Sequence, residues 1–317
     1  MRKLNSAIAS VLSGLLLAGC AVGPNYVAPK LSVADKFSEA QFSEAHTDTA
    51  VYSQTVYSQD KTAEKFWTLF NDAQLNQLVN DALAQNNNVH AALARVKQAR
   101  AINRESSLDL LPVITAQGGY TESLSSKAQL PVGTPRESKG YDAALDASWE
   151  LDLFGQKRRA LEAARAGYQA TEASLHDVQL IVIAEVTRTY FELRGQQLQL
   201  DVTQRNVDIQ RETLRITRAR FDAGSGSELD LSRAQALFAT SNANVAPLQA
   251  AIARSIHRLS VLTGQQPNAL NVTLNPQAEL PALPELVAVG DPVSMLRRRP
   301  DVRIAERTLA ADTARVG

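Results

Sequence analysis

The chain has 317 residues and a formal net charge of zero, with 44% hydrophobic and 21% charged residues. This charge balance gives no reason to expect a nucleic-acid partner, and the single cysteine, Cys20, excludes an intrachain disulfide. The length allows one to three domains, and the low aromatic content (5%) beside abundant Ala, Leu, Gln and Arg indicates a helix-rich chain.

Residues 1–19 are predicted to be a lipoprotein signal peptide. Arg2 and Lys3 precede an apolar run that is too short to span a bilayer as a mature helix. The run ends in Leu17-Ala18-Gly19-Cys20, which resembles the bacterial lipobox, where the signal is cut before the cysteine and the thiol takes a diacylglycerol. An ordinary signal peptide that happens to contain a cysteine is the alternative.

We therefore expect the mature chain to begin at an acylated Cys20. Each buried methylene of an acyl chain adds about 0.8 kcal/mol of membrane affinity, so several chains would hold the protein firmly. The next residue, Ala21, is not the aspartate linked to inner-membrane retention, which makes the outer membrane the expected destination.

Residues 20–72 are predicted to be a lipid-anchored arm that lies extended on the surface. Pro24 and Pro29 cannot continue a helix, and residues 31–62 are polar without a sustained period. The aromatic stretch Phe66–Phe70 either docks this arm onto the body or begins the core of the next helix.

A helix and two strands are predicted next. The helix covers 73–106, with a possible break at Asn86-Asn87-Asn88, and Pro112 closes it. The strands cover 109–122 and 141–152, and the segment between them, with its prolines and glycine, is expected to be an exposed loop.

The second strand alternates over the roughly 10 residues that a tilted strand needs to cross a membrane. Its odd positions are apolar, with Tyr141 and Trp149 placed as in the aromatic girdles of a membrane barrel. A soluble strand over a core would also alternate, so the two aromatic residues favour the membrane interpretation. The even positions would line a polar lumen with four carboxylates, which are Asp142, Asp146, Glu150 and Asp152.

Residues 155–223 are predicted to be one helix about 100 Å long, because the stretch has no proline and few glycines. Two apolar series recur along it every seven residues, about 200° apart around the helix. A two-stranded coiled coil needs only one such seam, whereas two opposed seams suit a stave with a neighbour on each side. The series are Leu193, Leu200, Val207, Leu214 and Phe221, and Val202, Ile209 and Ile216.

A short turn is predicted to join this helix to a returning helix over 228–264. Gly224 suits the left-handed position after a helix, Ser227 can cap the next helix, and Asp230 can complete a pair like a capping box. The returning helix has one clean apolar seam, and Pro247 is expected to kink it. It is about 48 Å shorter than the long helix, so we expect the helix over 73–106 to stack end to end with it.

Residues 265–317 are predicted to be a proline-rich linker followed by the start of a second repeat. Asn88-Val89 and the alanines after it match Asp301-Val302 and the alanines after it, at an offset of 213 (301 − 88 = 213). We therefore expect an N-terminal fragment, truncated after its first repeat.

Six motifs stand in a fixed order along residues 17–317, and they are Cys20–Tyr26, Phe66-Trp67, Trp149–Gly155, Arg220–Asp230, Leu262–Gly264 and Arg299–Val302. In this order they resemble the NodT/OprM-type outer-membrane efflux lipoproteins of the TolC superfamily. The resemblance implies a mainly α fold. In such a fold, long coiled-coil helices would form a periplasmic α-barrel and strands a transmembrane β-barrel, and residues 265–317 would supply an equatorial linker and the start of a second repeat.

The resemblance also implies a function, that of a passive outer-membrane channel subunit in a tripartite efflux pump. By this resemblance the channel would be a homotrimer, lipid-anchored in the bacterial outer membrane and extending into the periplasm. It would work with a periplasmic adaptor protein and an inner-membrane pump of the resistance–nodulation–division class, and would export drugs or other toxic small molecules. The residues that would contact the adaptor at the helical tip are Arg220, Gly224, Ser225, Gly226, Ser227, Leu229 and Asp230.

No enzyme activity, cofactor or metal site is predicted. The four histidines lie on scattered segments without metal-ligand spacing, and no nucleophile motif stands out. A lipid-anchored periplasmic coiled-coil scaffold without channel activity is the alternative function, which accounts for Cys20 and the heptads but not for the alternating strand. The lumen carboxylates lead to a further hypothesis, a mild preference for cations.

Overall fold

The computed structural model describes residues 21–30, 32–34, 56–58, 65–133, 135–284, 286–288 and 290–317. The chain forms two compact units. Unit 1 comprises Met1–Pro29, Val96–Thr171 and Ile304–Gly317, and unit 2 comprises Lys30–Arg95 and Glu172–Arg303.

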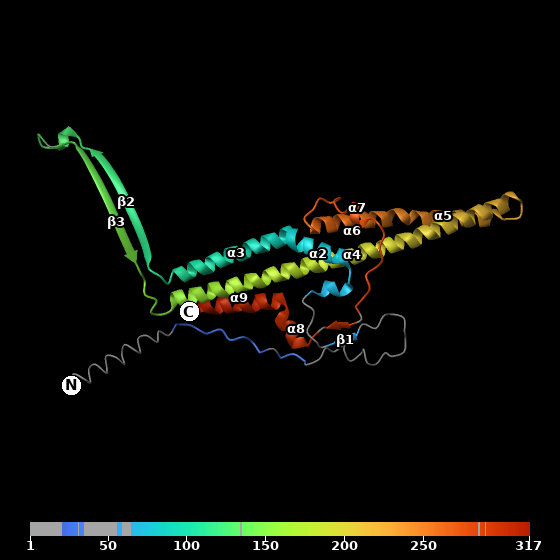
Figure 1. The fold of residues 1–317 in the computed structure, drawn as a ribbon, viewed down its shortest axis with the longest axis horizontal. Helices are drawn as coiled ribbons and strands as arrows, with labels where there is room; N and C mark the ends of the chain where they lie inside the picture. Colours follow the sequence, from blue (N-terminus) through green and yellow to red (C-terminus); the bar gives the residue numbers. More distant parts are fainter. Residues whose placement is uncertain are drawn as a thin grey trace. The chain divides into compact units, whose positions relative to one another are not determined.

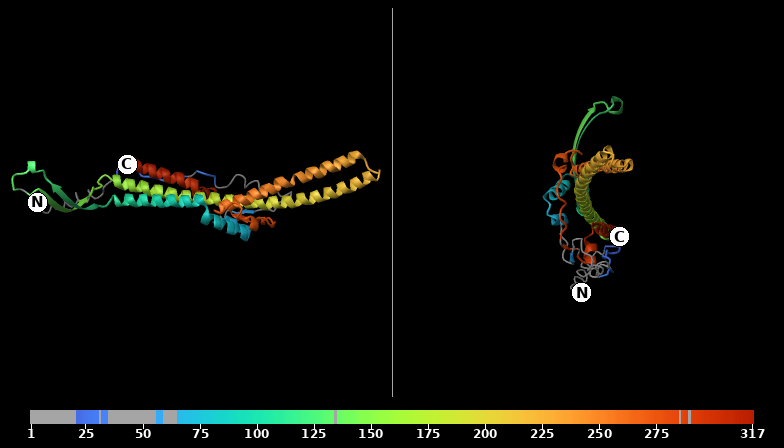
Figure 2. Two further views of the ribbon diagram at one scale, coloured as in Figure 1. Left: turned by 90° about the horizontal axis from the view of Figure 1, so that it is seen from above. Right: turned by 90° about the vertical axis from the view of Figure 1, so that its right-hand side faces the viewer.

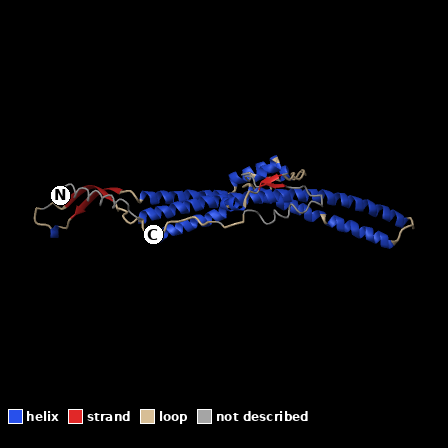
Figure 3. Cartoon of the chain, turned by 90° about the horizontal axis from the view of Figure 1, so that it is seen from below, coloured by secondary structure: helices blue, strands red, loops and turns tan. Residues whose placement is uncertain are grey.

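Helices dominate the described residues, and Figure 3 shows them in blue beside the few strands in red. The strands form two-stranded sheets, a parallel pair of β1 with β4 and an antiparallel pair of β2 with β3. Figure 1 labels the elements, which are β1 (Val56–Ser58), η2 (Phe66–Phe70), α2 (Ala73–Gln85), α3 (Asn87–Leu108), β2 (Val113–Leu124), η3 (Lys127–Gln129), β3 (Glu137–Ser148), α4 (Gln156–Asp222), α5 (Glu228–Ala243), α6 (Val245–Leu262), α7 (Asn271–Leu274), β4 (Leu286–Ala288), α8 (Pro292–Arg298) and α9 (Pro300–Val316).

The helix predicted over 73–106 is present as α2 and α3, and the break expected at the asparagines is confirmed. Asn86, only 5% exposed, lies between them. Its Oδ1 accepts a hydrogen bond from the amide of Asn88, and its Nδ2 donates to the carbonyl of Leu262, the last residue of α6, both at 2.9 Å. One side chain therefore joins the start of α3 to the end of α6, which confirms the predicted end-to-end stacking at this point.

The predicted long helix is α4, an unbroken helix of 67 residues. Its first seam faces α5 and α6, which run beside it in unit 2 (Figure 2), and Val207 of that seam is buried. The second seam is uncovered, because Val202, Ile209 and Ile216 are 48%, 61% and 42% exposed. The two predicted seams therefore become one packed face and one exposed face.

The returning helix is divided into α5 and α6, with Asn244 between them. The kink predicted at Pro247 is thus a break three residues earlier. Pro247 has no N–H for the carbonyl of Ala243 and its ring crowds that carbonyl. It therefore falls in the first turn of α6, where an amide has no partner in the helix. The predicted apolar seam is confirmed, because each of its members is buried or half-buried: Leu231, Ala234, Phe238, Val245, Leu248, Ile252, Leu259 and Leu262.

The core of unit 2 gathers apolar side chains from η2, α2, α4 and α6. The aromatic stretch is a separate short helix, η2, whose Trp67 is buried in this core and whose Phe70 meets Phe191 with ring centroids 4.9 Å apart. This favours the docking interpretation of the stretch. Asp72 then caps α2 through the amide of Leu75 and accepts a 2.8 Å hydrogen bond from the hydroxyl of Tyr190 on α4.

The core of unit 1 is built from small side chains. Ala166 of α4 lies against Ala310 and Ala311 of α9, with Tyr26 of the N-terminal segment packed beside them. Alanine at a contact lets two helices approach closely. Figure 1 shows α9 running beside the first part of α4.

The predicted repeat extends further than the matched residues. The α2–α3 break lies between Gln85 and Asn87, and the α8–α9 break lies between Arg298 and Pro300. Both boundaries differ by 213 (298 − 85 = 213 and 300 − 87 = 213). Two helix pairs with breaks at the same offset support the interpretation of an internal repeat.

The first strand begins later than predicted. β2 starts at Val113 and not at 109, because α3 continues to Leu108 and a turn follows it. Pro112, which has no N–H to give to a ladder, directly precedes the strand.

The second strand is displaced by four residues at each end. β3 runs over Glu137–Ser148 and not over 141–152. It ends at Ser148 because its partner there, Val113, is the first residue of β2, so later residues have no strand to pair with. The loop predicted between the strands is correspondingly shorter.

Candidate functional site

The turn between α4 and α5 is closed by its own backbone. The amide of Ser225 donates to the carbonyl of Arg220 and the amide of Gly224 donates to that of Phe221, both at 2.9 Å. Gly224 has φ +74°, the left-handed conformation that this helix ending requires. The predicted role of Gly224 is therefore confirmed. A Cβ at Gly226 would lie 3.0 Å from the amide nitrogen of Phe221, so this glycine lets the turn close tightly.

The start of α5 is capped as predicted. The hydroxyl of Ser227 accepts a 3.1 Å hydrogen bond from the amide of Asp230 and donates to the Asp230 carboxylate at 2.6 Å. Arg220, Ser225, Leu229 and Asp230 are all exposed. The tip therefore combines a rigid backbone with an accessible apolar side chain, an arginine and a carboxylate, as a docking surface needs.

The β2–β3 hairpin has one apolar and one polar face, and both are exposed. On the apolar face Tyr120 pairs with Tyr141, with ring centroids 5.0 Å apart, and Ala116 pairs with Leu145. Tyr141 and Leu145 are 80% and 74% exposed. A sheet in water normally buries such a face against a core, and none of the described residues covers this one.

Two of the predicted lumen carboxylates lie on the polar face. Asp146 accepts a 2.8 Å hydrogen bond from the side-chain amide of Gln117 on the neighbouring strand. The carboxylate of Asp142 lies over Gly119, where an added Cβ would come within 2.5 Å of its Oδ1. Gly119 thus leaves room for that acid.

The other two predicted lumen carboxylates, Glu150 and Asp152, lie beyond the end of β3, and their placement on the strand is wrong. Glu150 forms an ion pair with Lys157 at 3.1 Å. Asp152 accepts hydrogen bonds from the amides of Lys157 and Arg158, so it caps the first turn of α4. A carboxylate at a helix N-terminus is favoured by the helix dipole, which explains this position.

Arg159 on α4 is a buried cation that the sequence analysis missed. It donates three hydrogen bonds to the segment 22–25. Only the fold could reveal it, because its acceptors lie more than 130 positions away in the sequence and two of them are backbone carbonyls. Cys20, the predicted acylation site, lies outside the described residues.

Glu185 links the long helix to the returning helix. It accepts hydrogen bonds from Arg188 on its own helix, at 2.8 Å, and from Arg258 on α6. Burial alone would raise the pKa of Glu185, but the two guanidinium groups outweigh burial and hold its pKa below the ordinary value of 4.5. Glu185 is therefore ionised throughout the physiological pH range.

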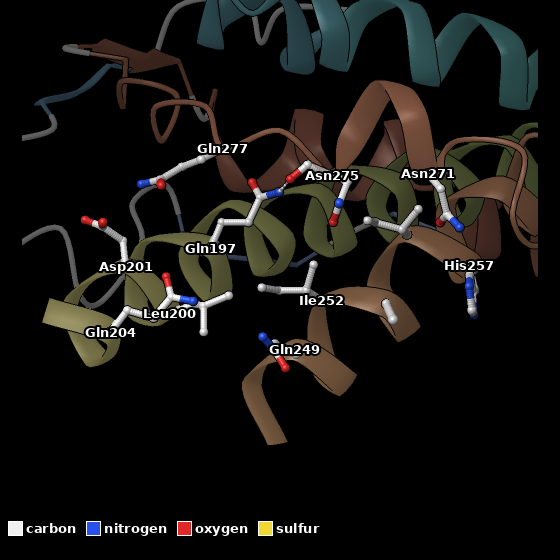
Figure 4. A pocket seen from close by; sticks show the side chains of 12 residues that line it. Gln197, Leu200, Asp201, Gln204, Gln249, Ile252, His257, Asn271, Asn275 and Gln277 are labelled. Atoms are coloured by element: carbon white, nitrogen blue, oxygen red, sulfur yellow. Dashed lines mark hydrogen bonds between the residues drawn. The ribbon is translucent and has the colours of Figure 1, made fainter. Parts of the chain in front are cut away.

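A groove of about 450 Å³ lies in unit 2 between α4, α6 and the segment around α7. Figure 4 shows Gln197 pointing from α4 towards Asn275, and its Nε2 donates to the carbonyls of Leu274 at 2.8 Å and Asn275 at 3.2 Å. No serine, cysteine or lysine is among the residues that line this groove. Gln197 thus fastens the end of α7 to the long helix.

Neither a cluster of metal-ligating side chains nor a membrane-spanning helix occurs among the described residues. There, no three His, Cys, Asp or Glu side chains gather as metal ligands would. In the same residues, no helix combines the length and apolar character that crossing a bilayer demands.

Comparisons with known proteins agree with this arrangement. The family model of the outer membrane efflux proteins matches residues 78–265. Nodulation protein T of Rhizobium leguminosarum bv. trifolii is 33% identical over 96% of this chain and 62% of its own length. The antibiotic efflux pump outer membrane protein ArpC of Pseudomonas putida is 28% identical over 98% of this chain and 63% of its own length.

A solved structure gives the same result for the fold. The outer-membrane channel OprN superimposes with a TM-score of 0.78 and 38% identity, covering 94% of this chain and 63% of that channel. The chain therefore spans a little under two thirds of the length of the relatives that it matches.

Proposed function

Since this chain belongs to the outer membrane efflux protein family, we propose that it forms part of the wall of a passive channel through which small toxic molecules leave the cell. In this proposal the β2–β3 hairpin lies in the outer membrane and the helices extend into the periplasm. Three copies assemble around the pore, and an inner-membrane pump of the resistance–nodulation–division class drives export.

The exposed apolar face of the hairpin is the observation that carries this proposal. Tyr141 lies on β3, and Trp149 directly follows the last residue of this strand, eight residues after Tyr141 (149 − 141 = 8). At about 3.4 Å per residue and a tilt near 45°, they are separated by about 20 Å along the membrane normal. An outer-membrane barrel has an apolar band of about 25 Å between its aromatic girdles. A coiled-coil scaffold has no use for such a hairpin, so this face favours the channel over the scaffold.

Oxygen accessibility along β3 tests the membrane location. Nitroxide labels on single added cysteines are to be compared at apolar-face and polar-face positions, Leu145→Cys and Ala144→Cys, in lipid vesicles. We expect the label at 145 to be reached preferentially by molecular oxygen from the lipid and the label at 144 by a water-soluble nickel chelate. Equal accessibility at neighbouring positions would rule the membrane strand out.

The helical tip is proposed to contact the periplasmic adaptor. Its rigid turn, its exposed Leu229 and its exposed Arg220 support this role. In a host whose own copy is deleted, a gene carrying Leu229→Asp should reach the outer membrane but fail to lower accumulation of a fluorescent efflux substrate. Thr240→Asp, another exposed position on α5, is the matched control. Full activity of the Leu229→Asp variant would contradict the assignment.

Acylation at Cys20 and a cation preference complete the proposal. The lipobox-like sequence before Cys20 supports a lipid anchor in the outer membrane. Asp142 and Asp146 on the polar face support a lumen that favours cations. If Asp142→Asn and Asp146→Asn together leave the ion selectivity of the assembled channel unchanged, the carboxylates do not set it.

A further inference from the structure

Arg159 is a buried cation in unit 1 whose bonding is directed mainly at the N-terminal segment. Its side chain is 7% exposed. Nε donates to the carbonyl of Val22 at 3.3 Å, and Nη2 donates to the carbonyl of Gly23 at 3.1 Å and to Oδ1 of Asn25 at 2.8 Å. Nη1 donates to Glu162 at 2.8 Å, which leaves every guanidinium nitrogen with an acceptor.

Ala21 and Val22 lie against the connection between β3 and α4. The amide of Val22 donates to the carbonyl of Phe154 at 3.1 Å. A Cβ on Gly155 would lie 2.7 Å from the Cα of Ala21, so only glycine lets the two backbones approach this closely. Gly155 also has φ +86°, a second reason for glycine at this position.

Tyr26 holds the other end of the segment. Its hydroxyl donates to Glu306 of α9 at 3.1 Å, and the guanidinium of Arg307 lies 5.8 Å from its ring centroid. The ring also packs on the alanine contact between α4 and α9. Residues 21–26 have no regular secondary structure, so these side-chain contacts, and not a ladder of backbone bonds, keep the segment in place.

We infer that Arg159 is a positioning residue that latches residues 21–25 to the start of α4, beside the connection that leads from β3 into this helix. The inference rests on the proposed function in two respects, the acyl anchor at Cys20 and the location of the β2–β3 hairpin in the outer membrane. Ala21, which lies against Gly155, directly follows Cys20 in the sequence, so the acyl chains would begin one residue from the β3–α4 connection. The acyl chains and the hairpin would then enter the periplasmic leaflet at one depth. The anchor would be held at a fixed position beside the hairpin and would not be a flexible tether.

The test uses a nitroxide at position 22 of the full chain, expressed with its own signal sequence. Val22 is 57% exposed, so Val22→Cys can carry the label while the backbone bonds of the segment remain. The labelled chain is to be reconstituted in vesicles of phosphatidylethanolamine and phosphatidylglycerol. Label mobility and its accessibility to oxygen against a nickel chelate are then measured with Arg159 unchanged and with Arg159→Ala, Arg159→Lys or Arg165→Ala.

The expected result is an immobile label at headgroup depth in the chain with Arg159 unchanged and in Arg165→Ala. Arg165 is an exposed arginine on α4, six residues after Arg159 (165 − 159 = 6). Arg159→Ala should give a mobile label without a defined depth. Arg159→Lys should restore part of the immobilisation, because an ammonium group can reach one or two of the same acceptors. An unchanged spectrum in Arg159→Ala would overturn the inference.

A second measurement keeps the latch separate from a loss of fold. Asn25→Ala removes one acceptor from the segment and leaves α4 untouched, so it should give an intermediate mobility with unchanged circular dichroism. Treating the chain that has no added cysteine with the thiol label tests independently whether Cys20 is acylated. An acylated Cys20 thiol cannot react, so uptake of label there would contradict the lipid anchor and with it the shared depth, while the mobility comparison would still report on the latch.

Discussion

Gly195 and Gly224 differ in one backbone angle, and that difference decides what an added methyl group does. A Cβ added to either glycine would have no atom of another part of the chain within 4 Å. Gly195 lies in regular α4 backbone, whereas Gly224 has φ +74°. Steric room is therefore equal, and only conformational preference separates the two positions.

Gly224→Ala should lower the free energy of unfolding by about 1–2 kcal/mol, because an L-residue pays this in the left-handed region. Gly195→Ala should raise it by about 0.5–1 kcal/mol, because glycine is that much poorer than alanine inside a helix. Urea titrations followed by circular dichroism measure both. A loss of stability in the two variants alike would mean that the α4 surface at 195 has no room for a methyl group.

Glu185 should make stability depend on acid. Its pKa is lowered in the folded chain from the ordinary 4.5, so the unfolded chain binds the proton more readily. Its contribution to stability is complete well above pH 4.5 and is lost as the pH falls through the lower folded-state pKa. Thermal melts between pH 6 and about pH 3 should therefore fall less steeply for Glu185→Gln than for the parent chain. Parallel curves would show that other carboxylates account for the acid effect.

The sequence reveals a residue's role when its partners are near in the chain. Gly224, Ser227 and Asp230 act within one turn, and their roles were predictable from local rules. Asn86 and Arg159 act on residues 176 and 134 or more positions away, and no local rule points to these partners. Asp152 shows the opposite case. Its sequence neighbours alternate like a strand, but the predicted strand has no partner residue beyond Ser148, which pairs with the first residue of β2.

At the scale of elements, the buried amide of Asn86 holds two helix ends together. Asn86→Ala should destabilise unit 2 by about 1–3 kcal/mol, because it leaves the amide of Asn88 and the carbonyl of Leu262 without this partner. Asn87→Ala, at an exposed neighbouring position, is the control and should change stability by less than about 0.5 kcal/mol. Equal losses of stability in Asn86→Ala and Asn87→Ala, measured by urea titration, would show that the Asn86 side chain does not hold the two helix ends together.

Element types were predicted better than element ends. The bounds of α4 were right to within one residue at each end, because a glycine stands beside each end. The start of β2 and both ends of β3 were wrong by four residues and the end of β2 by two, since strand ends depend on which residues of the partner strand are available. The helix breaks at Asn244 and not at Pro247, because a proline has no N–H to donate to the carbonyl four residues before it.

At the scale of the whole molecule, α4 presents an apolar face that nothing in the described chain covers. If three copies assemble as proposed, Ile209→Ser should weaken self-association in sedimentation experiments and leave helix content unchanged, because Ile209 is 61% exposed. Val207→Ser, on the packed seam, should instead lower stability by about 1–3 kcal/mol. Unaltered association of the Ile209→Ser variant would show that this face is not where copies meet.

The β2–β3 hairpin has a consequence for the order of assembly. Among the residues that the structure describes, no third strand pairs with β2 or β3, so the outer edge of each carries N–H and C=O groups without a strand beside them. Hydrocarbon offers no hydrogen bonds to such groups, and each would cost several kcal/mol there. If the hairpin enters the membrane as proposed, neighbouring strands must arrive with it, so insertion and ring closure become a single event. Until that event the hairpin needs a chaperone in the aqueous periplasm, because an exposed apolar face with two unpaired strand edges promotes aggregation.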